Sequence, residues 1–97
     1  MFGQMADLLS EAELDEQLPD GWDREGDEIV RSFGFDGYMN GLAFAQLVGE
    51  IAETQAHHPT LIVGYEEVEV RFTSHEAGGL TDQDVRMAEF INGEYDD

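Results

Sequence analysis

The run from Glu67 to Phe72 alternates charged and apolar side chains, and it constrains the fold more than any other stretch of the chain. In an extended strand, Val68, Val70 and Phe72 would share one face, and the charged residues between them would share the other. A strand with one buried and one solvated face is typical of an antiparallel sheet. The chain should therefore supply neighbouring strands and helices that cover the apolar face.

The rest of the sequence divides into elements that meet this requirement. Helices are expected at about 10–18, 37–55 and 81–93, and strands at about 22–25, 28–35, 61–63 and 67–72. Gly26 and Asp27 fit a tight hairpin between the first two strands. The order helix, strand, strand, helix, strand, strand, helix predicts an α+β fold: a four-stranded antiparallel sheet with three helices packed on one face.

Local signals set the ends of the helices. The capping residues are expected to be Ser10 with Glu13, Asp36, and Thr81 with Asp84. Asn92 and Gly93 are expected to end the last helix, with a frayed tail from 94 to 97. Residues at helical spacing predict the buried face of the longest helix: Leu42, Ala45, Val48, Ile51 and Ala52. Gly41 and Gly49 in that helix suggest close packing against the sheet. Arg31 interrupts the apolar face of its strand, so its head should reach solvent or an acid.

Length and charge limit the possible functions. The 97 residues are expected to form one domain, residues 1–97. The 23 acidic and 4 basic side chains give a net charge of −19, and the basic side chains are all arginine. Such a surface repels phosphate groups, which argues against nucleic-acid or membrane partners. At ~1 M salt the Debye length is only about 3 Å, so self-repulsion would be screened. The acid excess without lysine indicates a halophilic cytoplasm, with an ordinary acidic domain as the alternative.

The absence of cysteine limits the possible chemistry, and the absence of a secretion signal or membrane span limits the expected location. The chain has no cysteine, which excludes disulfides, thiolate metal sites and a thiolate nucleophile. The N-terminal residues lack the pattern of a secretion signal, and no apolar run approaches the ~20 residues of a membrane span. We therefore expect a cytoplasmic protein.

The three histidines lie within one short region, at positions 57, 58 and 75. Histidine titrates near neutral pH, so His57, His58 and His75 together indicate proton-transfer chemistry. His57 and His58 precede Pro59 and would point to opposite sides of an extended chain. A zinc site with Glu53 or Asp84 as a further ligand is an alternative, although adjacent histidines are not the usual helical ligand spacing.

Each of these residues also has an ordinary structural interpretation. His75 alone would be a satisfied surface or core histidine, and Asp84 a helix cap. Glu53, near the end of a helix, would be a solvated charge. Tyr65 could simply cover the end of the sheet.

The residues taken as a set resemble a known family. Glu53, three residues, His57-His58-Pro59, five residues, Tyr65, nine residues, His75, eight residues and Asp84 follow the signature of the pterin-4a-carbinolamine dehydratases. The resemblance extends over most of the chain and includes Trp22, Phe33-Gly34-Phe35 and Gly79-Leu80-Thr81. Two positions depart from the family pattern: Ser74 stands where threonine is usual, and Ala56 lacks a polar side chain.

This resemblance implies an enzyme, a hydro-lyase that dehydrates 4a-hydroxytetrahydropterin without metal or cofactor. It implies the catalytic set His57, His58 and His75, in which His57 and His75 form the acid/base pair and His58 orients the substrate. It further implies substrate contacts at Pro59, Ser74, Glu76 and Ala77, besides the histidines. Glu53 and Asp84 are implied as supporting acids.

The resemblance also leaves alternatives open. Animal members of the family serve as dimerisation partners of a transcription factor, so a non-catalytic adaptor is possible. The pterin could instead be a related, molybdopterin-type compound. The family forms dimers or tetramers, which implies a homo-oligomer.

Overall fold

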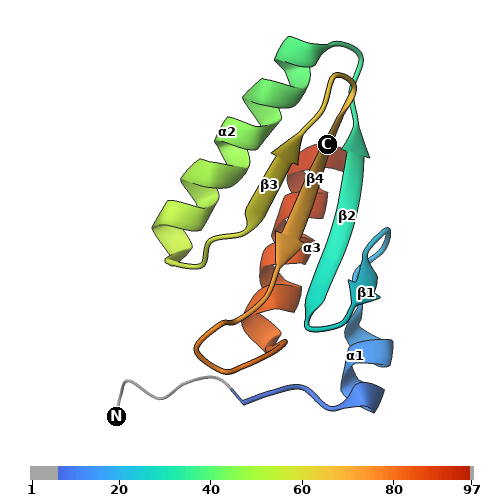
Figure 1. Cartoon of the computed structure of the whole chain (residues 1–97), viewed down its shortest axis with the longest axis vertical. Helices are drawn as coiled ribbons and strands as arrows, with labels where there is room; N and C mark the ends of the chain where they lie inside the picture. The colour runs from blue at the N-terminus through green and yellow to red at the C-terminus, as the bar shows by residue number, and fades with distance from the viewer. Residues whose placement is uncertain (1–6, 97) are drawn as a thin grey trace.

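The computed structural model describes residues 7–96, which contain three helices and four strands (Figure 1). In chain order they are α1 (Glu11–Gln17), β1 (Asp23–Glu25), β2 (Glu28–Gly34), α2 (Tyr38–Gln55), β3 (Thr60–Val63), β4 (Glu67–Phe72) and α3 (Asp82–Asp96). The predicted order of elements is confirmed.

The strands form one antiparallel sheet in the order β1-β2-β4-β3. Phe33 of β2 pairs with Val68 of β4, and Leu61 of β3 pairs with Val70 of β4. Gly26, at a φ of 61°, forms the turn between β1 and β2 with Asp27, as predicted. The chain thus has the α+β fold with a four-stranded antiparallel sheet that the order of the expected elements predicted.

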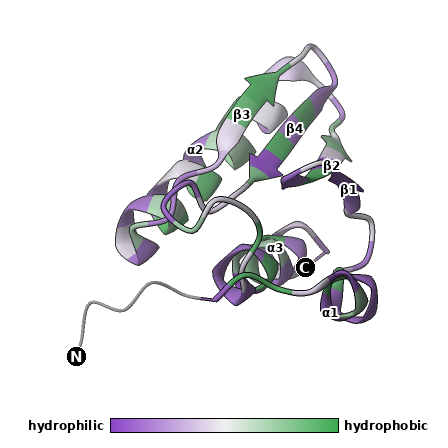
Figure 2. Cartoon of the chain, turned by 60° about the horizontal axis from the view of Figure 1, so that its bottom comes forward, coloured by the Kyte–Doolittle hydropathy of each residue, from purple (hydrophilic) through white to green (hydrophobic). Residues whose placement is uncertain are grey.

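The three helices cover the same face of this sheet. Figure 2 shows α1 and α3 together beneath the strands. Side chains from all three helices join one core with the apolar residues of β2 and β4, a cluster that includes Leu14, Ile29, Phe33, Phe44, Val48, Val68, Val70, Phe72, Ala88 and Ile91. The helices therefore bury the apolar side of the strands, as expected for an antiparallel sheet with one buried face.

The opposite face of the sheet carries an ion-pair cluster around Arg71. Its guanidinium lies 2.6 Å from the Glu69 carboxylate, 2.9 Å from that of Glu28 and 3.1 Å from that of Glu25. The hydrogen bonds that Arg71 donates to the carboxylates of Glu69 and Glu28 raise the pKa of Arg71 above its ordinary value. One of the few basic residues of the chain is thus used to hold together the acidic face of the sheet.

The first helix starts as predicted, whereas the second does not. The Ser10 hydroxyl accepts a hydrogen bond from the Glu13 N–H, and the Glu13 carboxylate accepts one from the Ser10 N–H, which confirms the capping box. The prediction that Asp36 caps α2 is wrong. Gly37 occupies the N-cap position at a φ of 112°, a backbone conformation that glycine adopts without strain, and no side chain caps the helix.

The buried face of α2 also differs from the predicted one. Val48 and Ala52 are buried as expected, together with Gly41 and Phe44. The other predicted members are only half-buried: Leu42, Ala45 and Ile51. A Cβ on Gly41 would lie 3.3 Å from Cγ2 of Val68, which confirms close packing there. At Gly49 a Cβ would meet nothing within 4 Å, so the same prediction is wrong for that residue.

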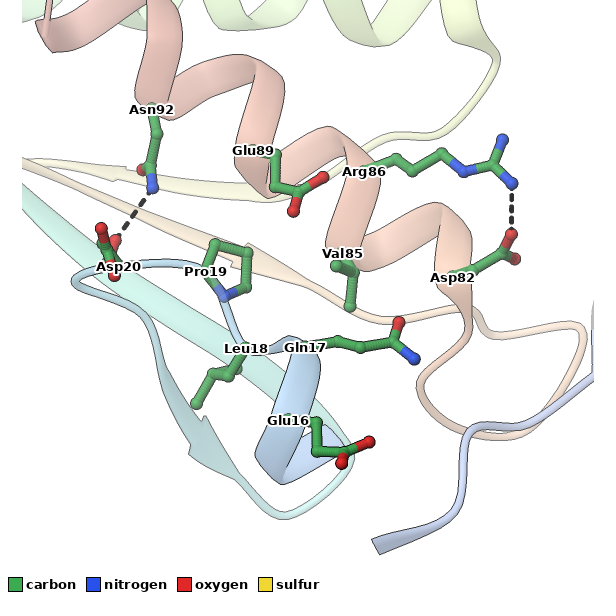
Figure 3. Close-up of a pocket in the computed structure, with 10 residues that line it drawn as sticks. All are labelled: Glu16, Gln17, Leu18, Pro19, Asp20, Asp82, Val85, Arg86, Glu89 and Asn92. Carbon is green, nitrogen blue, oxygen red and sulfur yellow. Dashed lines mark hydrogen bonds and ion pairs between the residues drawn. The ribbon is translucent and has the colours of Figure 1, made fainter. Parts of the chain in front are cut away.

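The predicted end of α3 at Asn92 and Gly93 is wrong, because the helix continues to Asp96. The Asn92 side chain is engaged in tertiary contacts instead of ending the helix. Its Oδ1 accepts from Nε1 of Trp22 at 2.8 Å and from the Arg31 guanidinium at 2.6 Å. Its Nδ2 donates to the Asp20 carbonyl at 2.9 Å (Figure 3). Arg31, expected to reach solvent or an acid, is therefore bound by an amide. The expectation of a frayed tail fails for Tyr95, whose hydroxyl donates to the Gly34 carbonyl, whereas Asp97 lies outside the described residues.

Within residues 7–96, no helix is both long and apolar enough to cross a bilayer.

Candidate active site

His57 lies just beyond the C-terminal end of α2. Ala56 ends this helix in the left-handed conformation, at a φ of 53°, and the His57 N–H donates to the Ala52 carbonyl at 3.1 Å. The imidazole then stacks on Phe72 at the end of β4, with ring centres 5.7 Å apart and planes within 3° of parallel. The helix end and the strand end together fix the ring.

Asp84, on the first turn of α3, binds this imidazole. Its Oδ1 lies 2.6 Å from Nε2 of His57, and the two side chains are 0% and 13% exposed, respectively. Its Oδ2 accepts hydrogen bonds from the Ser74 hydroxyl at 2.8 Å and from the Thr81 N–H at 2.9 Å. Asp84 is therefore both a cap of α3, as predicted, and the partner of His57.

The hydroxyls of Ser74 and Thr81 extend this buried network, 2.9 Å from each other. The family resemblance implied Ser74 as a substrate contact; in the structure Ser74 is buried and donates a hydrogen bond to Asp84. Thr81, fully buried, was foreseen only as a helix cap. The spacing Thr81-x-x-Asp84 was the signal available for this link, because a capping box already implies a bond between the two residues.

His58 makes a separate pair with Glu53. Its Nε2 lies 2.5 Å from the Glu53 carboxylate, and both side chains are exposed, His58 by 59% and Glu53 by 77%. The adjacent histidines thus have different carboxylate partners, in keeping with the predicted divergence of their side chains. His58 and Pro59 line an open cavity of about 490 Å³ between the C-terminal half of α2 and β3.

His75, Glu76 and Ala77 lie in the loop between β4 and α3. The N–H groups of Ala77 and Gly78 both donate to the Ser74 carbonyl, and Ser74 forms a β-bridge with Gly79. The side chains of His75 and Glu76 are exposed. Because Ser74 binds Asp84, and Asp84 binds His57, two hydrogen bonds link the segment that carries His75 to the imidazole of His57.

Two further cavities lie along α3. One of about 350 Å³ adjoins His57 and is otherwise lined by Gln55, Gln83, Arg86, Met87 and Phe90, none of which the sequence predicted as site residues. The other, of about 780 Å³, lies between α1 and α3 and has no histidine in its lining (Figure 3). Arg86 borders both and pairs with Asp82 at 2.6 Å.

The arrangement suits proton transfer. An imidazole held by a buried carboxylate has one nitrogen fixed by that bond and one available for exchange with a ligand. Among residues 7–96, no group of three or more histidine and acidic side chains is placed to hold a metal ion.

The fold and the site define a small α+β protein with two histidine–carboxylate pairs beside one end of its sheet. The family model described as pterin 4 alpha carbinolamine dehydratase matches residues 7–93, and the chain belongs to this family.

Curated relatives from halophilic archaea are similar over nearly the whole chain. A protein of Haloarcula marismortui is 50% identical over 95% of this chain and 100% of its own length. One of Natronomonas pharaonis is 51% identical over 88% of this chain and 92% of its own. Both carry the name "Putative pterin-4-alpha-carbinolamine dehydratase".

Two solved structures share the fold. A Brucella melitensis protein described as a transcriptional coactivator/pterin dehydratase superposes with a TM-score of 0.85 at 31% identity, over 92% of this chain and 99% of that one. A pterin dehydratase-like protein described as a RuBisCO assembly factor in the alpha-carboxysome has a TM-score of 0.60 at 16% identity, over 74% of this chain and 83% of that one. The second likeness shows the fold alone.

Proposed function

We propose that this chain is a hydro-lyase that converts 4a-hydroxytetrahydropterin into quinonoid dihydropterin and water. The observation that carries the proposal is the buried contact between His57 and Asp84, tied through Ser74 to the segment that bears His75. Membership of the dehydratase family supports the same reaction. His57 and His75 are the proposed acid/base pair.

The reaction needs two proton transfers and no change of oxidation state. The N5–H bond breaks, and its electrons form the C4a=N5 double bond while the C4a–O bond breaks. The departing oxygen takes up a proton and leaves as water. Hydroxide is a poor leaving group, so one imidazole must supply the proton to oxygen while another takes the N5 proton. Each transfer contributes typically ~10²- to 10⁴-fold to the rate.

The remaining residues have supporting parts in the proposal. His58, held by Glu53, orients the pterin beside Pro59. Glu76 and Ala77 extend the contact surface from the exposed loop of His75. The reaction as written needs no cofactor.

A direct assay tests the proposal. Synthetic carbinolamine is mixed with the protein at several molar salt, with and without a chelator, and dehydration is followed against the spontaneous rate. We expect acceleration that survives the chelator. Dehydration at the spontaneous rate under both conditions would sink the dehydratase proposal, and acceleration that the chelator abolishes would favour the zinc alternative.

A non-catalytic adaptor is the second candidate, favoured by the Brucella melitensis neighbour, whose description includes a coactivator role. Such a role would use exposed apolar side chains, which include Tyr38, Met39, Ile62, Tyr65 and Phe90. It would not require the histidines. Capture of a partner that persists when His57 and His75 are replaced, in a protein without dehydratase activity, would favour the adaptor.

The identity of the pterin is a separate question. The dehydration assay, repeated with a molybdopterin-type substrate, would distinguish between pterins.

A further inference from the structure

The hydrogen bonds around Asp84 have a fixed direction. Ser74 has one hydroxyl proton, and it is donated to Oδ2 of Asp84. In the 2.9 Å contact between the two hydroxyls, Thr81 must therefore be the donor and Ser74 the acceptor. The Thr81 oxygen in turn accepts from the Gln83 N–H at 3.3 Å. Every proton in this chain of contacts points toward Asp84.

The backbone prevents the donor and acceptor roles in these hydrogen bonds from being exchanged. The second donor to Oδ2 is the N–H of Thr81, and a backbone amide cannot accept a hydrogen bond through its nitrogen. Two donors on Oδ2 favour the ionised carboxylate, because hydrogen bonds to charged acceptors are the stronger ones. Oδ1 is then an acceptor as well, so the proton in its 2.6 Å contact with His57 belongs to Nε2.

We infer that Nδ1 is the nitrogen of His57 that exchanges a proton with the ligand, and that Ser74 and Thr81 are positioning residues that enforce this assignment through Asp84. The inference rests on the proposed dehydration for its chemical consequence. Neutral His57 carries its proton on Nε2, so the lone pair on Nδ1 can accept one from the substrate. Protonated His57 can return that proton only from Nδ1, since Nε2 remains bound to the carboxylate.

The inference assigns Ser74 a role different from the substrate contact that the family resemblance implied. Ser74 is 7% exposed, and its hydroxyl, which donates to Asp84 and accepts from Thr81, has one lone pair left and no proton to offer a ligand. It acts on the reaction through His57. Its loss should therefore change turnover more than substrate binding.

The substitution Asp84→Asn tests the direction. The position of Oδ2 faces two donors, so the amide oxygen must occupy it and the NH₂ group must face His57. Nε2 would then have to accept, which moves the imidazole proton to Nδ1. Long-range ¹H–¹⁵N correlation spectra of ligand-free, ¹⁵N-histidine-labelled protein report this tautomer. We expect Nε2–H in the parent protein and Nδ1–H in Asp84→Asn. The Nδ1–H form in the parent, or the Nε2–H form in the variant, would overturn the inference.

Asp82→Asn is the matched control, because it removes a carboxylate from the same helical turn that pairs with Arg86 and not with a histidine. The control should keep the parent tautomer. If the parent protein shows no dehydratase activity, the spectra still decide the proton direction, so failure of the proposed function is seen separately from failure of this inference.

Kinetics of Ser74→Ala test the positioning role. In an active enzyme we expect kcat to fall about 10-fold or more, with KM within about twofold, and Ser74→Thr to restore kcat. A rise in KM with unchanged kcat would instead make Ser74 a substrate contact and refute the positioning role. Asp84→Asn should lower kcat by at least about 100-fold, as expected when an imidazole is held in the wrong tautomer.

Discussion

His57 and Asp84 are separated by 27 positions in the chain, yet their side chains meet at 2.6 Å in the interior of the protein. The contact joins the end of α2 to the start of α3. It therefore forms only when both helices are packed on the sheet. A site assembled in this way makes sharp predictions, because stability and catalysis depend on the same few contacts.

Replacing either proposed acid/base histidine should stop the reaction but should affect stability differently. We expect His57→Ala and His75→Ala each to lower kcat by about 10²-fold or more. His57→Ala leaves Oδ1 of the buried Asp84 carboxylate without its hydrogen-bond partner, so it should also cost roughly 1–3 kcal/mol of unfolding free energy. His75 is exposed, and its replacement should leave the urea midpoint unchanged. Parent-like turnover in both variants would remove the acid/base proposal.

Glu53→Gln should weaken the orientation of His58. The side chains of Glu53 and His58 are both exposed, so their interaction is worth at most about 1 kcal/mol. We expect KM to rise by up to about fivefold with little change in kcat, measured by steady-state kinetics. Glu89→Gln, which removes an exposed helix carboxylate with no histidine partner, is the control and should leave KM unchanged. A fall in kcat without a change in KM would contradict a binding role.

Asn92→Ala should destabilise the fold without touching the histidines. The substitution leaves Nε1 of the buried Trp22 unpaired and removes the bonds to Arg31 and the Asp20 carbonyl. We expect a loss of about 2–4 kcal/mol in urea unfolding. Asn40→Ala is the matched control, since Asn40 makes one exposed bond to a carbonyl and should cost less than about 1 kcal/mol. Equal losses at the two positions would show that the contacts of Asn92 are unimportant.

Two glycines of α2 should respond oppositely to alanine. Gly49→Ala meets open space and should stabilise the helix by roughly 0.5–1 kcal/mol. At Gly41 the added methyl would lie 3.3 Å from Val68, so crowding should cancel or reverse that gain. Urea unfolding of both variants at constant high salt measures the difference. Equal stabilisation by both substitutions would contradict the packing described for Gly41.

Salt should stabilise this protein strongly. At a net charge of −19, self-repulsion acts over about 10 Å at 0.1 M salt but only about 3 Å at 1 M. We propose that Tm rises steeply with NaCl and that helicity measured by circular dichroism is lost on dialysis to low salt. Sucrose is the control, because it is excluded from the protein surface and favours the folded state without screening charge. It should not restore the fold at low salt. Full helicity in salt-free buffer would count against the halophilic interpretation.

The features that the sequence predicted correctly are those set by near neighbours in the chain. Alternation placed β4, and the capping box of Ser10 and Glu13 placed the start of α1, because both depend on residues a few positions apart. Asn92 is a local stop signal that was overridden, since its amide gains tertiary bonds to Trp22 and Arg31. Asp36 does not cap α2 because Gly37, at a positive φ, occupies the N-cap position instead.

The candidate site divides in the same way. The resemblance implied Glu53 and Asp84 as supporting acids without assigning them partners, and the structure places Glu53 against His58 and Asp84 against His57. The burial of Ser74 and its bond to Thr81 could not be predicted, because they depend on how the loop after β4 folds back onto α3. Hydrogen-bond direction is visible only once all partners are in place.

Because α3 carries both Asp84 and Asn92, this helix completes two separate parts of the protein. During synthesis the chain emerges from its N-terminus, so the sheet and α2 are exposed before residues 82–96 leave the ribosome. Until then, His57 has no carboxylate and the Trp22 indole has no acceptor. A nascent chain that stalls before this helix should therefore be catalytically silent, and vulnerable to proteases.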